Sequence, residues 1–222
     1  STMTGAGGYY GLYFDRASSN TVSGSYIQGS TAVYVFNSAG AAIGASVLVS
    51  TSASLWLTGG SVNLNLSSST ILGGPQGSGI HLDQYNKGLI ALSSNVVRGS
   101  RYGVFIATQS AGATLSISSL TLSELAAGAT GINFSGGVFV TTFSDVRFAD
   151  SSIAVNINAS QLTTGTSIYM LAPAGHKAGA AYCNDYGGYN SPNYVHWPSL
   201  PTGCGFGYNV AQTGGYDFTK IQ

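Results

Sequence analysis

Two acidic residues, Glu124 and Asp150, have a spacing that would suit carbohydrate chemistry. Each ends a six-residue pattern that recurs along the chain. If the two patterns lie in neighbouring turns of a repeat structure, the carboxyl groups stand about 5 Å apart, as in retaining glycoside hydrolases. One carboxyl would then protonate the leaving oxygen, and the other, kept ionised by Arg98 or Arg101, would attack the anomeric carbon. The alternative is that both are solvated turn residues.

The other acidic residues predict no second catalytic pair and no metal site. Asp15 and Asp83 each follow a copy of the repeat unit described below, but about 14 Å apart at about 4.8 Å per stacked strand, which exceeds a glycosidase separation. No repeat gathers the several carboxylates that a Ca²⁺-dependent lyase requires. The histidines, His81, His176 and His196, show no metal-ligand spacing with the cysteines. The sequence therefore predicts neither a metal nor a cofactor.

Two cysteines, Cys183 and Cys204, enclose a loop rich in Gly, Pro and Tyr. A disulfide between them would stabilise the fold by roughly 3 kcal/mol by restricting the unfolded chain. An exterior location would favour its formation. The alternative is a pair of free, buried thiols, and the sequence leaves both states open.

The same region carries the side chains expected to recognise a ligand. Residues 173–222 hold four of the five prolines and many aromatic residues, interspersed with Gly, Asn and Ser. This composition is typical of adaptable binding loops. We therefore expect an irregular C-terminal cap or module that makes the functional contact. The residues predicted to bind are Tyr186, Tyr189, Tyr194, Trp197 and Tyr208.

A repeat that fills the rest of the chain must position these residues. A four-residue unit (small, apolar, any, apolar) occurs seven times, at intervals of 21 to 28 residues. The second and fourth side chains share one face of a strand and point inward, whereas the third points outward. A period in the twenties is typical of solenoids. The units begin at Gly11, Ala32, Ser54, Gly79, Gly103, Gly131 and Ala154.

A second apolar pattern recurs about 12 to 18 residues after a unit begins, with copies starting at Ser25, Ser69, Asn95, Ser119 and Asp145. Each repeat therefore holds at least two strands separated by polar turns, with room for a third. Leucine-rich repeats have a similar period but need a helix or an Asn/Cys ladder, which the sequence lacks. The prediction is an all-β fold, a parallel β-helix of about seven coils over residues 8–172. The inward residues Ile80, Val104 and Ile132 should stack in one column.

The outward third positions predict an aromatic ladder on one side of the solenoid. They are Tyr13, Tyr34, Trp56, His81 and Phe105, followed by two asparagines. Stacked strands would make this ladder roughly 20 Å long. An exposed apolar stripe usually marks an interface, here with an identical subunit or with the C-terminal segment. The alternative is a glycan platform, with sugar rings lying on the aromatic faces.

The stretch Ser93–Ile106, which reads Ser-Ser-Asn-Val-Val-Arg-Gly-Ser-Arg-Tyr-Gly-Val-Phe-Ile, resembles bacteriophage tailspikes and tail fibres of the pectate-lyase-like superfamily. The resemblance covers about residues 8–172 and implies a right-handed β-helix. It does not specify a function, because the superfamily contains lyases, hydrolases, adhesins and inert stalks. It also implies a homotrimer, and end-to-end stacking into a filament is the alternative assembly.

The composition narrows the possible partners and the location. Charged residues make up only 6% of the chain, with seven basic and seven acidic residues. This low and balanced charge does not provide the excess of basic residues that binds nucleic acid or an anionic membrane surface. No apolar run is long enough to span a bilayer, and no signal peptide is evident at the N-terminus. A surface solvated by Ser, Thr, Asn and Gly is common in secreted and virion-borne proteins, so we expect an extracellular or virion-surface location.

These observations predict two domains, a β-helix with an N-terminal cap over residues 1–172 and the C-terminal segment 173–222. The favoured function is a non-enzymatic virion fibre or adhesin that presents a binding face to host-surface glycans. A self-assembling filament or coat subunit is a second hypothesis. A polysaccharide depolymerase using Glu124 and Asp150 is a third.

Overall fold

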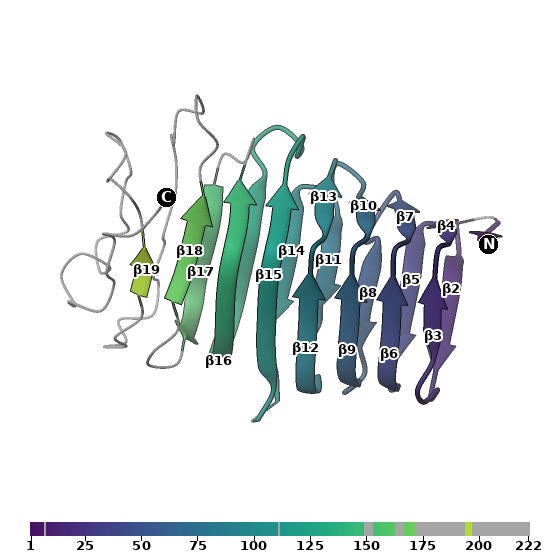
Figure 1. Ribbon diagram of the computed structural model, residues 1–222, viewed down its shortest axis with the longest axis horizontal. Helices are drawn as coiled ribbons and strands as arrows, with labels where there is room; N and C mark the ends of the chain where they lie inside the picture. Colours follow the sequence, from purple (N-terminus) through teal and green to yellow (C-terminus); the bar gives the residue numbers. More distant parts are fainter. Residues whose placement is uncertain (7, 111, 149–152, 163–166, 172–193, 197–222) are drawn as a thin grey trace.

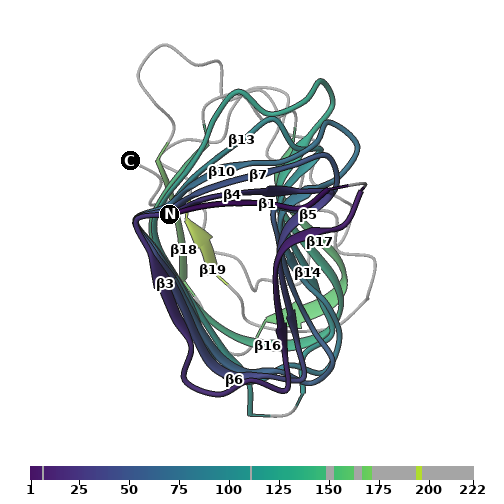
Figure 2. The ribbon, with the colours of Figure 1, turned by 90° about the vertical axis from the view of Figure 1, so that its right-hand side faces the viewer.

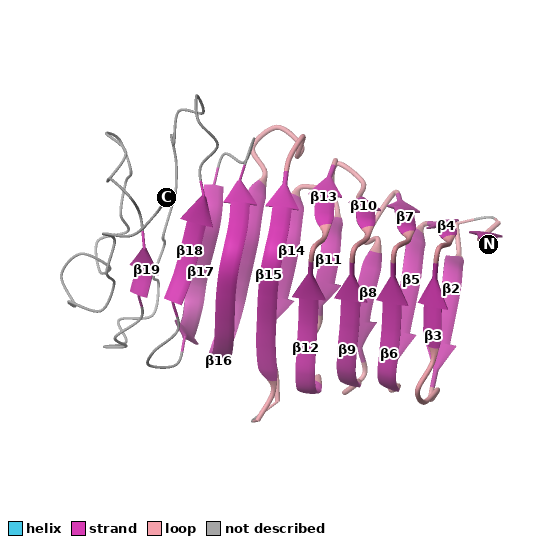
Figure 3. Ribbon diagram, in the orientation of Figure 1, coloured by secondary structure: helices cyan, strands magenta, loops and turns pink. Residues whose placement is uncertain are grey.

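The computed structural model describes residues 1–6, 8–110, 112–148, 153–162, 167–171 and 194–196, with side chains as far as residue 135. Within these residues the chain forms strands, turns and loops and contains no helix (Figure 3). All of the strand pairings are parallel, and they stack into a β-solenoid of about six turns. The predicted all-β parallel β-helix is therefore confirmed.

Three faces surround one apolar interior (Figure 2). The first face consists of β2 (Tyr10–Asp15), β5 (Thr31–Phe36), β8 (Leu55–Thr58), β11 (Ser78–Leu82), β14 (Tyr102–Ala107) and the first parts of β16 (Thr130–Phe148) and β17 (Ile153–Leu162). The second face consists of β3 (Thr21–Ser23), β6 (Ala39–Gly44), β9 (Val62–Ser67), β12 (Lys87–Ser93), the first part of β15 (Thr114–Leu122) and the middle of β16. The third face consists of β1 (Thr2–Thr4), β4 (Tyr26–Gly29), β7 (Val47–Ser50), β10 (Thr70–Leu72), β13 (Val96–Arg98), the ends of β15 and β16, and β18 (Ser167–Leu171).

The coil is right-handed. In Figure 1 the near strands β6, β9 and β12 point upward, the fainter strands β2, β5 and β8 point downward, and the chain advances from right to left. The strands of the third face cross from front to back at the top (Figures 1 and 2). A chain that rises in front and descends behind while advancing to the left traces a right-handed screw, the usual hand for parallel crossover connections.

The register of the first face follows the repeat unit residue by residue. Ile80 pairs with Val104, and Val104 pairs with Ile132, so the predicted inward column is confirmed. The seven units occupy successive positions on this face, from β2 to β17. The predicted count of about seven coils is slightly too high, because seven stacked strands enclose only about six complete turns.

Each turn also contains the third strand for which the sequence left room, and these strands form the second face.

One copy of the second pattern was missed in the sequence. It is strand β7 of the third face, and Val47–Ser50 lacks the Gly that ends several other copies of the pattern. The fourth copy of that pattern was placed one residue too early. Val96 pairs with Thr121 and Val97 with Leu122, so this copy begins at Leu120 rather than at Ser119.

The small first position of the repeat unit is required at the corner between the third and first faces. A Cβ on Gly79 would lie 2.2 Å from Cγ1 of Val97, and a Cβ on Gly103 would lie 2.6 Å from Cδ2 of Leu122. Both neighbours are inward side chains of the third face. The corner therefore leaves no room for a side chain at these two positions, because protein interiors are close-packed.

A column of buried polar side chains follows the corner between the second and third faces. The backbone N–H of Ser25 donates to Oγ of Ser46, Ser46 donates to Oγ of Ser69, and Ser69 donates to Oδ1 of Asn95. The residue before each of them has a positive φ, at Gly24, Ala45, Ser68 and Ser94. The hydroxyls and the amide satisfy backbone groups that the sharp turn removes from the sheet ladders.

Strand β18 is the last described strand within residues 8–172, the range predicted for the solenoid. One strand beyond it, β19 (Tyr194–His196), pairs in parallel with β18. This strand lies in the segment predicted as the C-terminal module. The rest of that segment, and with it the predicted domain division at residue 172, lies outside the described residues.

Candidate functional site

The aromatic ladder forms on the outer surface of the first face. Neighbouring rings approach one another along its whole length, with centroid separations of 5.4 Å for Tyr13–Tyr34, 5.5 Å for Tyr34–Trp56, 4.9 Å for Trp56–His81 and 4.8 Å for His81–Phe105. The parallel register pairs these residues directly across strands. Ring contacts of this kind contribute about 0.5–1.5 kcal/mol per pair beyond area burial.

Three further rings widen the ladder and were missed in the sequence. Tyr10 lies 4.5 Å from the ring of Tyr34, Phe36 lies 6.5 Å from that same ring, and Tyr102 lies 5.5 Å from the ring of Phe105. None of them occupies the third position of the unit, so the repeat did not identify them. The resulting patch is two rings wide in places.

The ladder remains open to solvent at its N-terminal end. Tyr13 is 46% exposed, whereas Trp56, His81 and Phe105 are half-buried. Interplanar angles of 51° for Tyr13–Tyr34 and 65° for Tyr34–Trp56 mean that these rings do not cover each other's faces completely. Part of each face is therefore available to an apolar ligand surface, such as the C–H face of a sugar ring.

A row of mixed residues runs beside the ladder at the end of each first-face strand. Asp15 pairs with Phe36, and Phe36 pairs with Thr58. Asp83 continues this row, with its Oδ2 accepting a hydrogen bond of 3.0 Å from Oγ1 of Thr58. Carboxylate and hydroxyl groups thus adjoin aromatic rings. Asp15 and Asp83 are separated by two intervening strands, which is a wider spacing than that of paired glycosidase carboxylates.

His81 is the ladder residue whose ionisation is perturbed. Burial among its aromatic neighbours lowers the pKa of His81, and the nearby Asp83 carboxylate partly opposes this effect. Desolvation disfavours the charged imidazolium more than the single carboxylate favours it. The ladder therefore contains a neutral imidazole at neutral pH, stacked on Phe105.

Lowering the pH is expected to destabilise the fold through His81. In the unfolded chain the imidazole titrates near its ordinary pKa of about 6.5, whereas in the folded chain its pKa is lower. The stability that neutral His81 provides is therefore present above about pH 6.5 and is lost as pH falls from there toward the folded-state pKa. The measurement is the thermal unfolding temperature between pH 8 and pH 5, for the natural chain and for His81→Phe.

The His81→Phe variant should show a flatter pH dependence than the natural chain, because Phe is uncharged and Phe105 already fits the next position of the ladder. Comparing the two chains removes the contributions of His176 and His196, which both retain. Identical pH profiles would contradict the role assigned to His81.

Only one member of the predicted hydrolase pair, Glu124, lies among the described residues. Oε2 of Glu124 lies 3.6 Å from Nη1 of Arg98, with the two side chains 67% and 44% exposed. An exposed ion pair of this kind contributes little to stability. Asp150 lies outside the described residues, although Leu122 pairs with Phe148 two residues before it. The register up to Phe148 agrees with the alignment on which the prediction relied.

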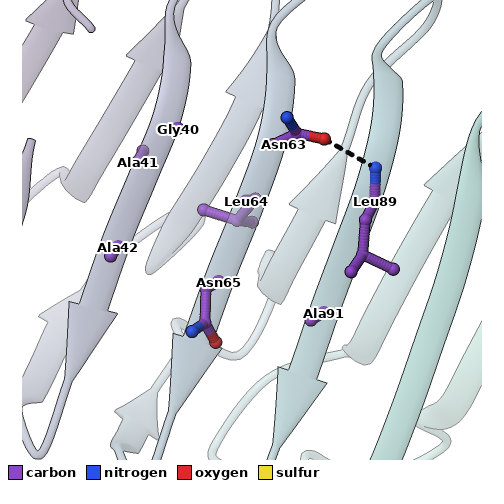
Figure 4. Close-up of a pocket in the computed structure, with 8 residues that line it drawn as sticks. All are labelled: Gly40, Ala41, Ala42, Asn63, Leu64, Asn65, Leu89 and Ala91. Carbon is purple, nitrogen blue, oxygen red and sulfur yellow. Dashed lines mark hydrogen bonds between the residues drawn. The ribbon is translucent and has the colours of Figure 1, made fainter. Parts of the chain in front are cut away.

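The second face carries a shallow hollow of about 360 Å³ (Figure 4). Small residues line its floor, among them Gly40, Ala42 and Ala91. Oδ1 of Asn63 accepts a hydrogen bond of 2.8 Å from the backbone N–H of Leu89, whose side chain is half exposed. None of the residues lining the hollow is ionisable, so it offers no group for acid–base catalysis.

The third face carries a further group of apolar side chains on its outer surface. One outward row contains Tyr26, Val47 and Val96 together with Thr70, and the row beside it contains Val49 and Leu72 between Gln28 and Arg98. The five apolar side chains are at least partly exposed. Sequence reasoning did not mark this surface, because β-branched residues are expected in any strand.

The remaining predicted site residues cannot be placed. Tyr186, Tyr189, Trp197 and Tyr208 lie outside the described residues, as do both cysteines, and Tyr194 is described only as the first backbone position of β19. In the described part of the chain no three His, Cys, Asp or Glu side chains group as metal ligands. That part also contains no helix long and apolar enough to cross a membrane.

Comparison with known proteins finds no matching family model, no similar curated protein and no similar solved structure. The fold therefore defines the class on its own. The chain is a right-handed parallel β-solenoid with an aromatic ladder along one face.

Proposed function

We propose that this chain is a non-enzymatic fibre or adhesin that presents its first face to glycans of a host surface. The proposal includes an extracellular or virion-surface location and the tailspike-like and tail-fibre-like character suggested by Ser93–Ile106. An elongated, nearly uncharged solenoid suits this function, because a regular row of side chains matches the regular repeat of an extended polysaccharide.

The aromatic ladder is the observation that carries the proposal. Its rings are spaced by 4.8 to 5.5 Å, tilted, and open to solvent at the N-terminal end. Asp15 and Asp83 adjoin it with acceptor groups for sugar hydroxyls. Aromatic surface beside carboxylates can bind the apolar face and the hydroxyl edge of a pyranose together. The C-terminal aromatic residues, from Tyr186 to Tyr208, are proposed as a second contact region.

Removing two rings from the open end of the ladder should weaken glycan binding. We expect the double variant Tyr13→Ser/Tyr34→Ser to lose about tenfold or more in affinity, or about 1.4 kcal/mol. The measurement is binding to a glycan array, followed by titration with the strongest ligand. A matched control is Tyr26→Ser, which removes an exposed tyrosine from the third face and should bind normally.

A second double variant, Tyr189→Ser/Trp197→Ser, tests the C-terminal contact region in the full chain. If it alone loses binding, the glycan contacts the C-terminal segment rather than the ladder. Equal loss in the ladder variant and in Tyr26→Ser would indicate a general effect on folding. A full-length chain that binds no glycan on the array would refute the proposed function.

A structural role in self-assembly is a second candidate function, and the third face favours it. The partly exposed Tyr26, Val47, Val49, Leu72 and Val96 form an apolar surface that a second copy could cover. A trimer around this face, or a filament, would account for such a surface on a chain with few charges. Ordered polymers formed by the purified chain without any glycan ligand would favour this alternative.

A further inference from the structure

The corner between the first and second faces contains an open hollow of about 540 Å³ in the third and fourth turns. Thr58, Gly59 and Gly60 contribute from one turn, and Asp83, Tyr85 and Lys87 contribute from the next. We call it the corner hollow. It adjoins the aromatic ladder, because Thr58 and Asp83 follow Trp56 and His81 by two residues.

The two corners that line this hollow differ in length. Residues 59–61 separate β8 from β9 in the third turn, whereas residues 83–86 separate β11 from β12 in the fourth turn. In the shorter corner, Gly59 and Gly60 present no side chains, and a Cβ on Gly59 would lie only 2.6 Å from the Phe36 ring.

Asp83 is held in position before any ligand arrives. Its Oδ2 accepts a hydrogen bond from Oγ1 of Thr58 at 3.0 Å, and its Oδ1 accepts one from the backbone N–H of Gln84 at 2.8 Å. Each carboxylate oxygen can accept a further hydrogen bond. The Asp83 carboxylate is therefore a pre-oriented acceptor for ligand hydroxyls, and its side chain loses little conformational entropy on binding.

Lys87 supplies a positive charge to the same hollow. It is exposed and forms no ion pair with any described residue. In particular, its ammonium and the Asp83 carboxylate do not form a salt bridge with each other. The corner hollow thus offers one fixed anion and one unpaired cation, in a chain that has few charged residues overall.

Tyr85 is held in an unfavourable backbone conformation beside these charges. Its φ is +66°, and its ring is 61% exposed. Bulky residues rarely adopt this conformation, whereas Asn and Gly, which occupy it at Asn37 and Gly60, adopt it readily. Two hydrogen bonds fix the backbone of Tyr85. The N–H of Tyr85 donates to the carbonyl oxygen of Thr108, and the carbonyl oxygen of Tyr85 accepts a hydrogen bond from Oγ of Ser110. Other described non-glycine residues, such as Arg16 and Glu124, also have a positive φ, but Tyr85 is the one aromatic residue among them. Its exposed ring is therefore a candidate for contact with a ligand.

We propose that the corner hollow binds a pyranose unit that carries a carboxylate, such as a hexuronic acid within a polysaccharide. The ring of Tyr85 lies against the apolar face of the sugar, Asp83 accepts hydrogen bonds from its hydroxyls, and Lys87 pairs with its carboxylate. This inference rests on the proposed glycan-binding function and adds the position and the charge of one sugar unit.

The test compares two probes, an oligosaccharide of alternating glucuronic acid and N-acetylglucosamine and the same oligosaccharide with its carboxylates methyl-esterified. The full-length chain should bind the acidic probe at least tenfold more tightly than the ester, as measured by calorimetric titration. Lys87→Gln should reduce that preference to less than about threefold. Tyr85→Gly should weaken the binding of both probes, because both have the same sugar rings.

Tyr85→Gly also separates binding from folding. Since Gly adopts a positive φ freely, the unfolding temperature of this variant should equal or exceed that of the natural chain. Tyr26→Ser serves as the surface control and should leave both affinities unchanged.

Three results would overturn the inference while leaving the proposed function intact, provided that the full-length chain still binds glycans on the array. They are equal affinity for the acidic probe and its ester, no effect of Lys87→Gln on that preference, and no effect of Tyr85→Gly on either affinity. Absence of all glycan binding, on the array and in the titrations, would refute the proposed function itself.

Discussion

The Val104→Asp variant is expected to be unfolded at room temperature. Val104 is completely buried in the inward column between Ile80 and Ile132. A carboxylate at this position would meet only apolar side chains in the column, and burying an unpaired charge is strongly unfavourable. The expected loss exceeds about 4 kcal/mol, which is a large part of the typical stability of a domain. Far-UV circular dichroism should show loss of the β-sheet signal.

The Ser116→Asp variant provides the control for this experiment. Ser116 lies on the second face in the following strand of the same turn, at an outward, partly exposed position. The same acidic side chain should change the stability there by no more than about 0.5 kcal/mol. A folded Val104→Asp protein with an unfolding temperature close to that of Ser116→Asp would contradict the assigned register.

The second large effect is expected at Asn95, in the buried polar column. Oδ1 of Asn95 accepts a hydrogen bond of 3.0 Å from the backbone N–H of Ser69, and its Nδ2 donates one of 2.9 Å to the carbonyl oxygen of Leu66. Asn95→Ala would leave both backbone groups without these partners in a region that is closed to solvent. We expect a loss of about 3 kcal/mol, because each buried group left unsatisfied costs about 1–3 kcal/mol.

Urea unfolding, followed by the fluorescence of Trp56 in a Trp197→Phe background, would measure this loss. The matched variant is Asn95→Ser, since Ser46 and Ser69 occupy the same column and accept hydrogen bonds from the preceding turn through Oγ. It should recover about half of the lost stability by restoring the acceptor but not the donor. An Asn95→Ala protein as stable as the natural chain would show that water replaces the amide.

The sequence predicted much of the first face correctly. The alternation of Leu12 and Phe14, or of Val104 and Ile106, identifies an inward pair, and repetition of that pair every 21 to 28 residues requires stacked strands. The outward residue between the members of each pair must then fall in one row. For this reason the aromatic ladder from Tyr13 to Phe105 could be predicted without a structure.

Other parts of the first face and its candidate site could not be predicted. Tyr10, Phe36 and Tyr102 join the ladder from positions that the repeat does not mark. Of the predicted hydrolase pair, the structure describes only Glu124, which forms an ion pair with Arg98. The C-terminal binding residues and the possible disulfide remain predictions from the sequence.

The sequence by itself determined the class of fold and the inward and outward sides of the first-face strands, because both depend on local periodicity. The tertiary structure decided how the turns align with one another. It moved the fourth copy of the second pattern by one residue to Leu120, added β7, and brought Asn95 into hydrogen-bonding contact with Ser69. It also brought Thr58, Asp83 and Tyr85 together at one corner. These features depend on corner lengths that differ from turn to turn, and only the hydrogen-bonded register between turns fixes which residues those corners bring together.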